Sequence, residues 1–241
     1  MRKLKVIVFD IKGRFAHFRK FYSNSSSLTY GIPPRTTLAG IVAAILGYER
    51  DEYYQVLDSD KLYITAKKLT TTSKIIQTLN YIRAENMKDI MIPKQYTQVP
   101  FEILTSENGV AYRVYLFHEN KNIFDEIEER LINQRFVYPP SLGAVNFHSS
   151  INYVGTIDAI AVSSSDFISI STPIRVDNLK ELKISSYRGR LIKERMVVNF
   201  DTNRIAKEIA SYIYDDDGNE IVAKVGDRIY QLSDGENIVF M

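Results

Sequence analysis

The chain has 241 residues, of which 45% are hydrophobic and 25% charged, which suits one large domain or two small ones with a buried core. It has no cysteine, and His17, His118 and His148 are far apart in sequence, so disulfides, a cysteine nucleophile and a structural zinc site are not expected. The longest apolar run is too short to cross a bilayer and the N-terminus lacks a signal-peptide pattern, so we expect a cytoplasmic protein.

Positive charge is concentrated near the N-terminus, although the formal net charge is only +2. Residues 1–40 contain eight basic residues and one acidic residue, so they carry +7 and the remaining residues carry −5. This asymmetry favours a focused anion-binding face. The alternative is an edge strand that lysines protect from further pairing.

The first predicted elements are a strand and a loop. Residues 3–13, KLKVIVFDIKG, are rich in β-branched side chains and end at a glycine, which predicts a strand. Residues 14–34 contain the tract YSNSSSLTYG, whose serines and asparagine are typical of a loop.

A helix is predicted next, in residues 33–47, PPRTTLAGIVAAILG. Prolines and threonines mark its start and Gly47 marks its end. One face is apolar at helical spacing and predicts contact with the core, through Leu38, Ile41, Val42, Ile45 and Leu46. A second face of small residues would admit a close neighbour, and it consists of Gly40, Ala43, Ala44 and Gly47.

The middle of the chain predicts strands and a polar excursion. We expect a short polar helix over residues 51–57, a strand over 61–69, and a long excursion from the sheet over 70–99. The Asn108-Gly109 pair predicts a hairpin turn between two apolar runs.

The last predicted elements are a helix over residues 122–133 and a strand over 151–162. The polar segment SSSD at 163–166 predicts a domain boundary. Beyond it we expect strands and one helix near residues 202–214.

The element order up to residue 162 is strand, helix, strand, strand, helix, strand. It predicts an α+β protein with the ferredoxin-like β-α-β-β-α-β fold, which RNA-recognition domains share. We therefore expect a ferredoxin-like domain over residues 1–165, interrupted by the excursion at 70–99, and a smaller β-rich domain over 166–241.

Residues 12–40 are the main candidate for nucleic-acid binding. Rings can stack on unpaired bases while neighbouring cations follow the phosphates, and the amides of a helix start can bind a phosphate. The competing interpretations are that some rings belong to the core and that the threonines only cap the helix. The candidate RNA contacts in this segment are Lys12, Arg14, His17, Phe18, Arg19, Lys20, Tyr30, Arg35, Thr36, Thr37 and Gly40.

Two later segments extend the candidate site. The glycine in YPPSLGAVNF, residues 138–147, either admits a close ligand or makes a turn. The segment KISSYRGRLIKERMVVNF, residues 183–200, is basic. It either extends the anion-binding surface of residues 12–40 or forms a hairpin that is exposed to solvent. The candidate contacts here are Gly143, Asn146, Arg188, Arg190 and Arg195.

Signals for catalysis are sparse. The sequence has no Ser-His-Asp spacing, HExxH motif or P-loop, and the carboxylates of FDEIEER lie on a predicted helix surface. His17 beside cations is compatible with metal-independent RNA cleavage, but such a histidine is more often a hydrogen-bond donor. We expect an RNA-binding protein and keep cleavage as the alternative.

Several segments resemble a known family. Residues 9–47, FDIKGRF through AAILG, closely resemble the N-terminus of the fifth core CRISPR-associated (Cas) protein family, of the RAMP superfamily, in its archaeal or type I-B variety. Weaker similarity extends over most of the chain, in LNYI (79–82), TQVPFEIL (97–104), YRVYL (112–116), PPSLGAVNF (139–147) and KERMVVNF (193–200).

The resemblance implies a subunit of the type I Cascade interference complex of antiviral defence. Such a subunit caps the 5′ handle of the CRISPR RNA, bridges the backbone and large subunits, and lies near target DNA at the PAM-proximal end. Its thumb, here residues 70–99, packs near the guide and the adjacent backbone subunit. No metal or cofactor is implied. Most subtypes are non-catalytic, but one processes precursor CRISPR RNA itself, so a metal-independent endoribonuclease is the alternative.

Overall fold

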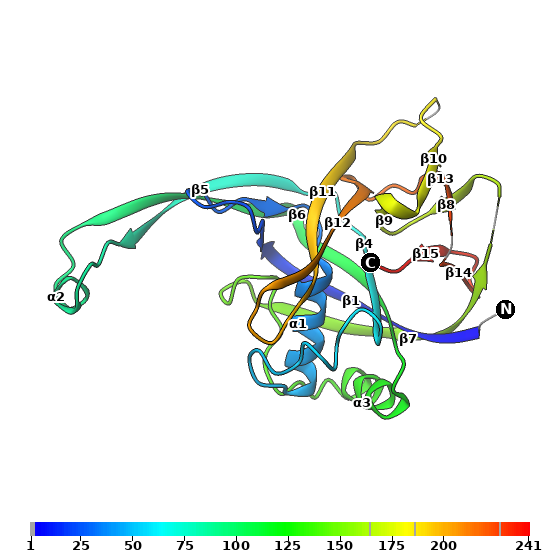
Figure 1. Cartoon of the computed structure of the whole chain (residues 1–241), viewed down its shortest axis with the longest axis horizontal. Coiled ribbons are helices and arrows are strands. Elements are labelled where there is room, and N and C mark those ends of the chain that lie inside the picture. Colours follow the sequence, from blue (N-terminus) through cyan, green and yellow to red (C-terminus); the bar gives the residue numbers. More distant parts are fainter. Residues whose placement is uncertain (1–2, 164, 186, 227) are drawn as a thin grey trace.

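Strands make up far more of this protein than helices do (Figure 1). The computed structural model describes residues 3–163, 165–185, 187–226 and 228–241. The largest sheet has the path β15-β14-β7-β1-β6-β4, and β5 pairs with β6 outside this path. The protein is therefore mostly β, more so than the predicted α+β class. None of the helices in the described ranges is long and apolar enough to cross a membrane.

Four strands and two helices form the centre of the molecule. The strands pair antiparallel in the order β7-β1-β6-β4, so the first strand lies between the third and the fourth. Along the chain these six elements follow the predicted order, and the helices predicted over residues 33–47 and 122–133 are confirmed. Their bounds are β1 (Lys3–Ala16), α1 (Arg35–Leu46), β4 (Leu62–Lys68), β6 (Tyr96–His118), α3 (Lys121–Ile132) and β7 (Ser149–Val162).

The central sheet is buried on both faces. Ile7 and Phe9 of β1 belong to the larger core, which also contains the apolar faces of α1 and α3. Val6 and Val8 point to the opposite face and join a second core with residues of β14 and β15. The nearly continuous apolar run of β1 follows from this arrangement, because successive side chains of a strand alternate between faces.

Helix α1 begins and ends as its sequence predicts. Its apolar stripe, including Leu38, Val42 and Ile45, is buried. Pro34 is the N-cap residue, and Gly47 ends the helix with a φ of 84°, a left-handed conformation that favours glycine.

A long hairpin projects from the body (Figure 1). It consists of β5 (Ser73–Ile82), α2 (Met87–Met91) and the first part of β6, and it corresponds to the predicted excursion at residues 70–99. Almost every residue of β5 is exposed. At the base of the hairpin, β2 (Phe18–Arg19) pairs with β3 (Thr29–Tyr30), and Ser27 bridges to Phe101 of β6.

The C-terminal part forms two three-stranded sheets, β10-β13-β8 and β11-β12-β9, and extends the large sheet through β14, which pairs with β7. The predicted boundary at residues 163–166 includes a residue outside the described ranges, so the division into two domains stays a prediction. The remaining bounds are β8 (Ile168–Ile170), β9 (Ile174–Arg175), the 3-10 helix η1 (Val176–Asn178), β10 (Leu179–Leu182), β11 (Leu191–Phe200), β12 (Ala206–Asp215), β13 (Ile221–Val225), β14 (Ile229–Leu232) and β15 (Asn237–Val239).

The predicted helix near residues 202–214 is wrong, because this segment is β12. Its buried residues Ala210, Tyr212 and Tyr214 recur at every second position, and the strand pairs with β11 along its length. The predicted helix over 51–57 is also wrong. Only isolated turns occur there, and Asp51 has a left-handed φ of 69°, which an α-helix does not allow.

The predicted hairpin at Asn108-Gly109 is wrong as well. β6 continues through this pair, and its register against β1 shifts from Gly13–Val110 to Phe15–Thr105. The turn-forming residues therefore accommodate a bulge in one long strand, with Gly109 at a φ of 81°.

Candidate nucleic-acid interface

A groove of about 380 Å³ runs beside the start of α1. Thr36, Thr37 and Gly40 form its floor, and the loop that carries Gly143 lies along one side, as the sequence predicts. Segment 51–54 and the turn between β11 and β12 complete the walls. Its lining residues are Thr36, Thr37, Gly40, Ile41, Ala44, Tyr53, Tyr54, Pro139, Ser141, Gly143, Phe200 and Arg204.

The start of α1 gives this groove a weakly positive floor. The amides of Thr37 and Leu38 both donate to Pro34 O, at 2.9 and 3.1 Å. The Thr36 amide has no hydrogen-bond partner among the described residues, and the N-terminal end of a helix dipole attracts anions. Of the two predicted amide donors, Thr36 is therefore available and Thr37 is already engaged.

The glycine loop is pressed against the end of β1. Leu142 O accepts a 3.0 Å hydrogen bond from the His17 amide. Gly143 has a φ of 90°, and a Cβ there would lie 1.9 Å from His17 O. Glycine is thus required at this position by backbone contact within the protein. Asn146, predicted to line the opposite wall, is exposed but is not among the groove residues.

Aromatic rings gather between the glycine loop and the base of the projecting hairpin. The Phe101 ring stacks on His17 with centroids 3.9 Å apart, and Phe147 lies 6.4 Å from Phe101 and 5.9 Å from Phe15. Phe15, Phe101 and Phe147 are half-buried, and the guanidinium of Arg14 lies 5.8 Å from the Phe15 ring. We call Phe15, Phe101 and Phe147 the aromatic cluster. Partly exposed rings beside a cation are suited to stacking on bases.

Arg35 does not face the groove, and its predicted contact with phosphate is corrected by the structure. The side chain is 2% exposed, and its guanidinium donates to Leu62 O (2.7 Å), Leu57 O (3.1 Å), Asn199 Oδ1 (2.9 Å) and Val198 O (3.2 Å). Burial lowers the pKa of Arg35 to about 10. Arg35 therefore ties together segment 57–62 and the end of β11 from inside.

Phe18, Tyr30 and His17 are also interior residues, at 1%, 2% and 5% exposed. The predicted stacking of Phe18 and Tyr30 on bases is therefore wrong for this structure. His17 Nδ1 lies 2.7 Å from Glu102 O and its Nε2 lies 3.0 Å from Ser27 Oγ, so both ring nitrogens are engaged. Burial lowers the pKa of His17, against the opposing effect of the bond to the Glu102 carbonyl. The enclosed imidazole therefore links Ser27 to the start of the body part of β6 at Glu102 and does not face a phosphate, whereas the backbone of His17 contacts the glycine loop.

The predicted cations do not form one continuous track. Lys20 is half-buried against Glu194 at 2.6 Å, and although burial opposes it, this carboxylate raises the pKa of Lys20. Lys12, Arg14 and Arg19 are exposed around the end of β1 and β2. These three cations stay candidates for phosphate contacts beside the aromatic cluster.

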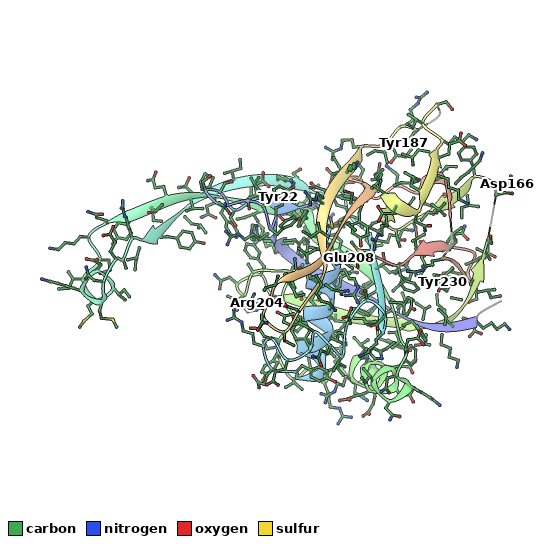
Figure 2. The ribbon with its side chains drawn as sticks, viewed as in Figure 1. Tyr22, Asp166, Tyr187, Arg204, Glu208 and Tyr230 are labelled. Atoms are coloured by element: carbon green, nitrogen blue, oxygen red, sulfur yellow. The ribbon has the colours of Figure 1, made fainter. Side chains whose placement is uncertain are left out.

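The basic segment before β11 lies away from the groove. Tyr187, next to Arg188, lies at the far end of β11 from Arg204 in Figure 2. β11 has 10 residues, so about 30 Å separates its two ends. Arg190 is paired with Asp217 at 2.8 Å, and Arg188 is exposed. Arg195 lies on β11 itself and is also exposed.

Three kinds of residue at this interface are not predicted from the sequence. Arg204 lies at the mouth of the groove, Tyr53 and Tyr54 line one wall, and Phe101 and Phe147 belong to the aromatic cluster. Arg204 occurs singly in a turn, so no local pattern marks it. Phe101 lies in a predicted strand segment and Phe147 ends the glycine-containing segment 138–147, and neither segment has a pattern that marks its ring for stacking.

Known proteins share this fold and part of this sequence. Residues 6–100 match the family model described as CRISPR-associated protein (Cas_Cas5). No curated protein matches the sequence. The crystal structure of a CRISPR protein from Archaeoglobus fulgidus has 15% identity and a TM-score of 0.59, over 97% of this chain and 98% of that one. A chain of a CRISPR RNA-guided surveillance complex has 13% identity and a TM-score of 0.52, over 90% of this chain and 91% of that one. The segment that matches the family model includes β1 and α1, and the similarity of fold to the two solved structures extends over nearly the whole chain.

Proposed function

We propose that this protein is a non-catalytic CRISPR RNA-binding subunit of a type I Cascade interference complex, which caps the 5′ handle of the guide. It would bind the handle on a ferredoxin-like domain and bridge the backbone and large subunits. The match of residues 6–100 to the CRISPR-associated family model and the fold similarity to a chain of an RNA-guided surveillance complex support a CRISPR role. The observation that carries RNA binding is the groove beside α1, which lies next to the aromatic cluster.

The groove and the aromatic cluster suit a single strand of RNA. The groove offers the Thr36 amide, threonine hydroxyls and Gly40, which admit a sugar-phosphate backbone at close range. The cluster offers ring faces on which unpaired bases stack, at about 1–3 kcal/mol per base. Because proteins distinguish RNA from DNA through the 2′-hydroxyl, we expect the groove hydroxyls to contact ribose.

The projecting hairpin supports a place in an assembly. Its tip exposes a group of large apolar side chains, which a protein surrounded only by water would rarely retain. We infer that this surface packs near the guide and against the adjacent backbone subunit. The exposed side chains at the tip are Met87, Ile90, Met91 and Ile92.

The state of His17 supports the non-catalytic proposal. A general acid or base must reach the proton that it transfers, and the imidazole of His17 is 5% exposed with both nitrogens hydrogen-bonded.

A gel-shift assay with labelled repeat RNA tests the proposed function, if it is read for both retardation and cleavage. We expect the purified protein to retard the RNA without cutting it, with or without metal. Metal-independent cleavage that His17→Ala abolishes would favour the endoribonuclease instead. No retardation by the protein, combined with tight binding to other subunits, would reduce its role to that of a scaffold.

A further inference from the structure

The two outer walls of the groove meet in an ion pair. Arg204, in the turn between β11 and β12, places Nε 3.4 Å from Oδ1 of Asp51. Figure 2 shows Arg204 beside α1, at the end of the hairpin that borders the groove. Both residues have a left-handed backbone, with φ values of 61° for Arg204 and 69° for Asp51. Non-glycine residues in this conformation are uncommon and concentrate at functional sites.

This ion pair is loose and only partly used. Its 3.4 Å separation exceeds the roughly 2.7–2.9 Å of a charge-assisted hydrogen bond, and the two side chains are 54% and 34% exposed. Tyr54 Oη donates to the same oxygen, Asp51 Oδ1, at 2.6 Å, and Arg50 Nε lies 3.5 Å from the other oxygen, Oδ2. The Nη atoms of Arg204 have no partner among the residues that the structure describes.

Arg204 is also the only cation among the described residues that line the groove. Arg35, which precedes the floor residues in sequence, donates its hydrogen bonds to carbonyl oxygens in the interior. The floor of the groove is therefore polar and open enough for a nucleic-acid backbone. The guanidinium of Arg204 lies at the mouth of the groove, where it pairs with the carboxylate of Asp51.

We propose that Arg204 is the phosphate-binding cation of the groove and that Asp51 occupies its guanidinium until a phosphate displaces it. A phosphate can take two parallel hydrogen bonds from a guanidinium, which is a stronger arrangement than one long contact to an exposed carboxylate. This inference rests on the proposed function, because it assumes that the groove receives a nucleic-acid backbone.

A double-mutant cycle on the full chain tests the exchange, with fluorescence anisotropy of a labelled oligouridylate as the readout. Arg204→Gly, which suits the left-handed backbone, should weaken binding about fivefold and reduce the salt slope by about 0.7. Arg204→Gln should agree with it. Asp51→Asn should tighten binding about threefold, because the phosphate then meets no competitor. The double variant Asp51→Asn with Arg204→Gly should bind like Arg204→Gly alone.

A matched control is the exposed pair of Glu181 and Lys224, 2.9 Å apart on β10 and β13. Glu181→Gln removes the same charge as Asp51→Asn and should leave the affinity within about twofold of wild type. Tightening by Asp51→Asn that persists without Arg204, or weaker binding by Asp51→Asn, would overturn the exchange while leaving the proposed function intact. If the wild type binds no RNA, the exchange and the proposed function fail together.

Discussion

The guanidinium of Arg35 lies 2.7 Å from the carbonyl oxygen of Leu62, in the interior of the protein. Arg35 is the first residue of α1, and the sequence predicts that it contacts a phosphate at the helix start. Here it points the other way and holds the ends of two segments whose outer parts form the walls of the groove. Arg35 thus shapes the proposed RNA site without touching it.

Arg35→Ala should lower the free energy of unfolding by about 3–5 kcal/mol. The substitution leaves a cavity and removes the donors from four interior acceptors. Urea unfolding gives the measurement. Arg19→Ala, at an exposed arginine, is the control and should change the stability by no more than about 0.5 kcal/mol. Equal effects of the two substitutions would contradict an interior role for Arg35.

Gly143→Ala should destabilise the protein more than Gly235→Ala does. Both glycines have nearly the same φ, 90° and 92°, so the cost of the left-handed conformation, about 1 kcal/mol, applies equally to both. Only at Gly143 would the new Cβ collide with backbone, 1.9 Å from His17 O, whereas nothing lies within 4 Å at Gly235. Thermal melting of the two variants isolates the collision, and identical melting temperatures would show that the loop does not press on β1.

The stability should fall as the pH drops below about 6.5, in part through His17. Burial lowers the pKa of His17 in the folded protein, so the unfolded chain takes up the proton first and is favoured by acid. The loss begins at the pKa of the unfolded chain and ends at the lower, folded value. His17→Gln should flatten this part of the profile when urea unfolding is repeated across the pH range. An unchanged profile in the variant would mean that His17 is not held neutral.

Local sequence patterns predicted the elements whose contacts are local. The stripe of Leu38, Val42 and Ile45 specifies α1 whatever its partners are, and Gly47 ends it. β12 was mistaken for a helix because its pairing with β11 depends on residues beyond a local window. The pair Asn108-Gly109 has strong turn chemistry, but β1 pairs with β6 on both sides of it, while β5 pairs with β6 before it and β4 after it.

The candidate site was predicted in part for the same reason. Thr36, Gly40 and Gly143 do come together, because a helix start and a glycine loop keep their local shape in the fold. Which side chains stay exposed depends on distant segments. Tyr30 is covered where its hydroxyl meets Arg195 O, and the contact lies 165 positions away in the chain.

The most direct test of the central claim is the affinity of labelled repeat RNA for Thr37→Glu and for Asn122→Glu, measured by fluorescence anisotropy. Both substitutions add a carboxylate to the first turn of a helix, where it favours the helix dipole, so neither should unfold the protein. Thr37 lies in the groove, whereas Asn122 lies at the start of α3, outside it. If RNA occupies the groove, Thr37→Glu should weaken binding at least about tenfold and Asn122→Glu less than about twofold. Equal affinities for the two variants would contradict the account.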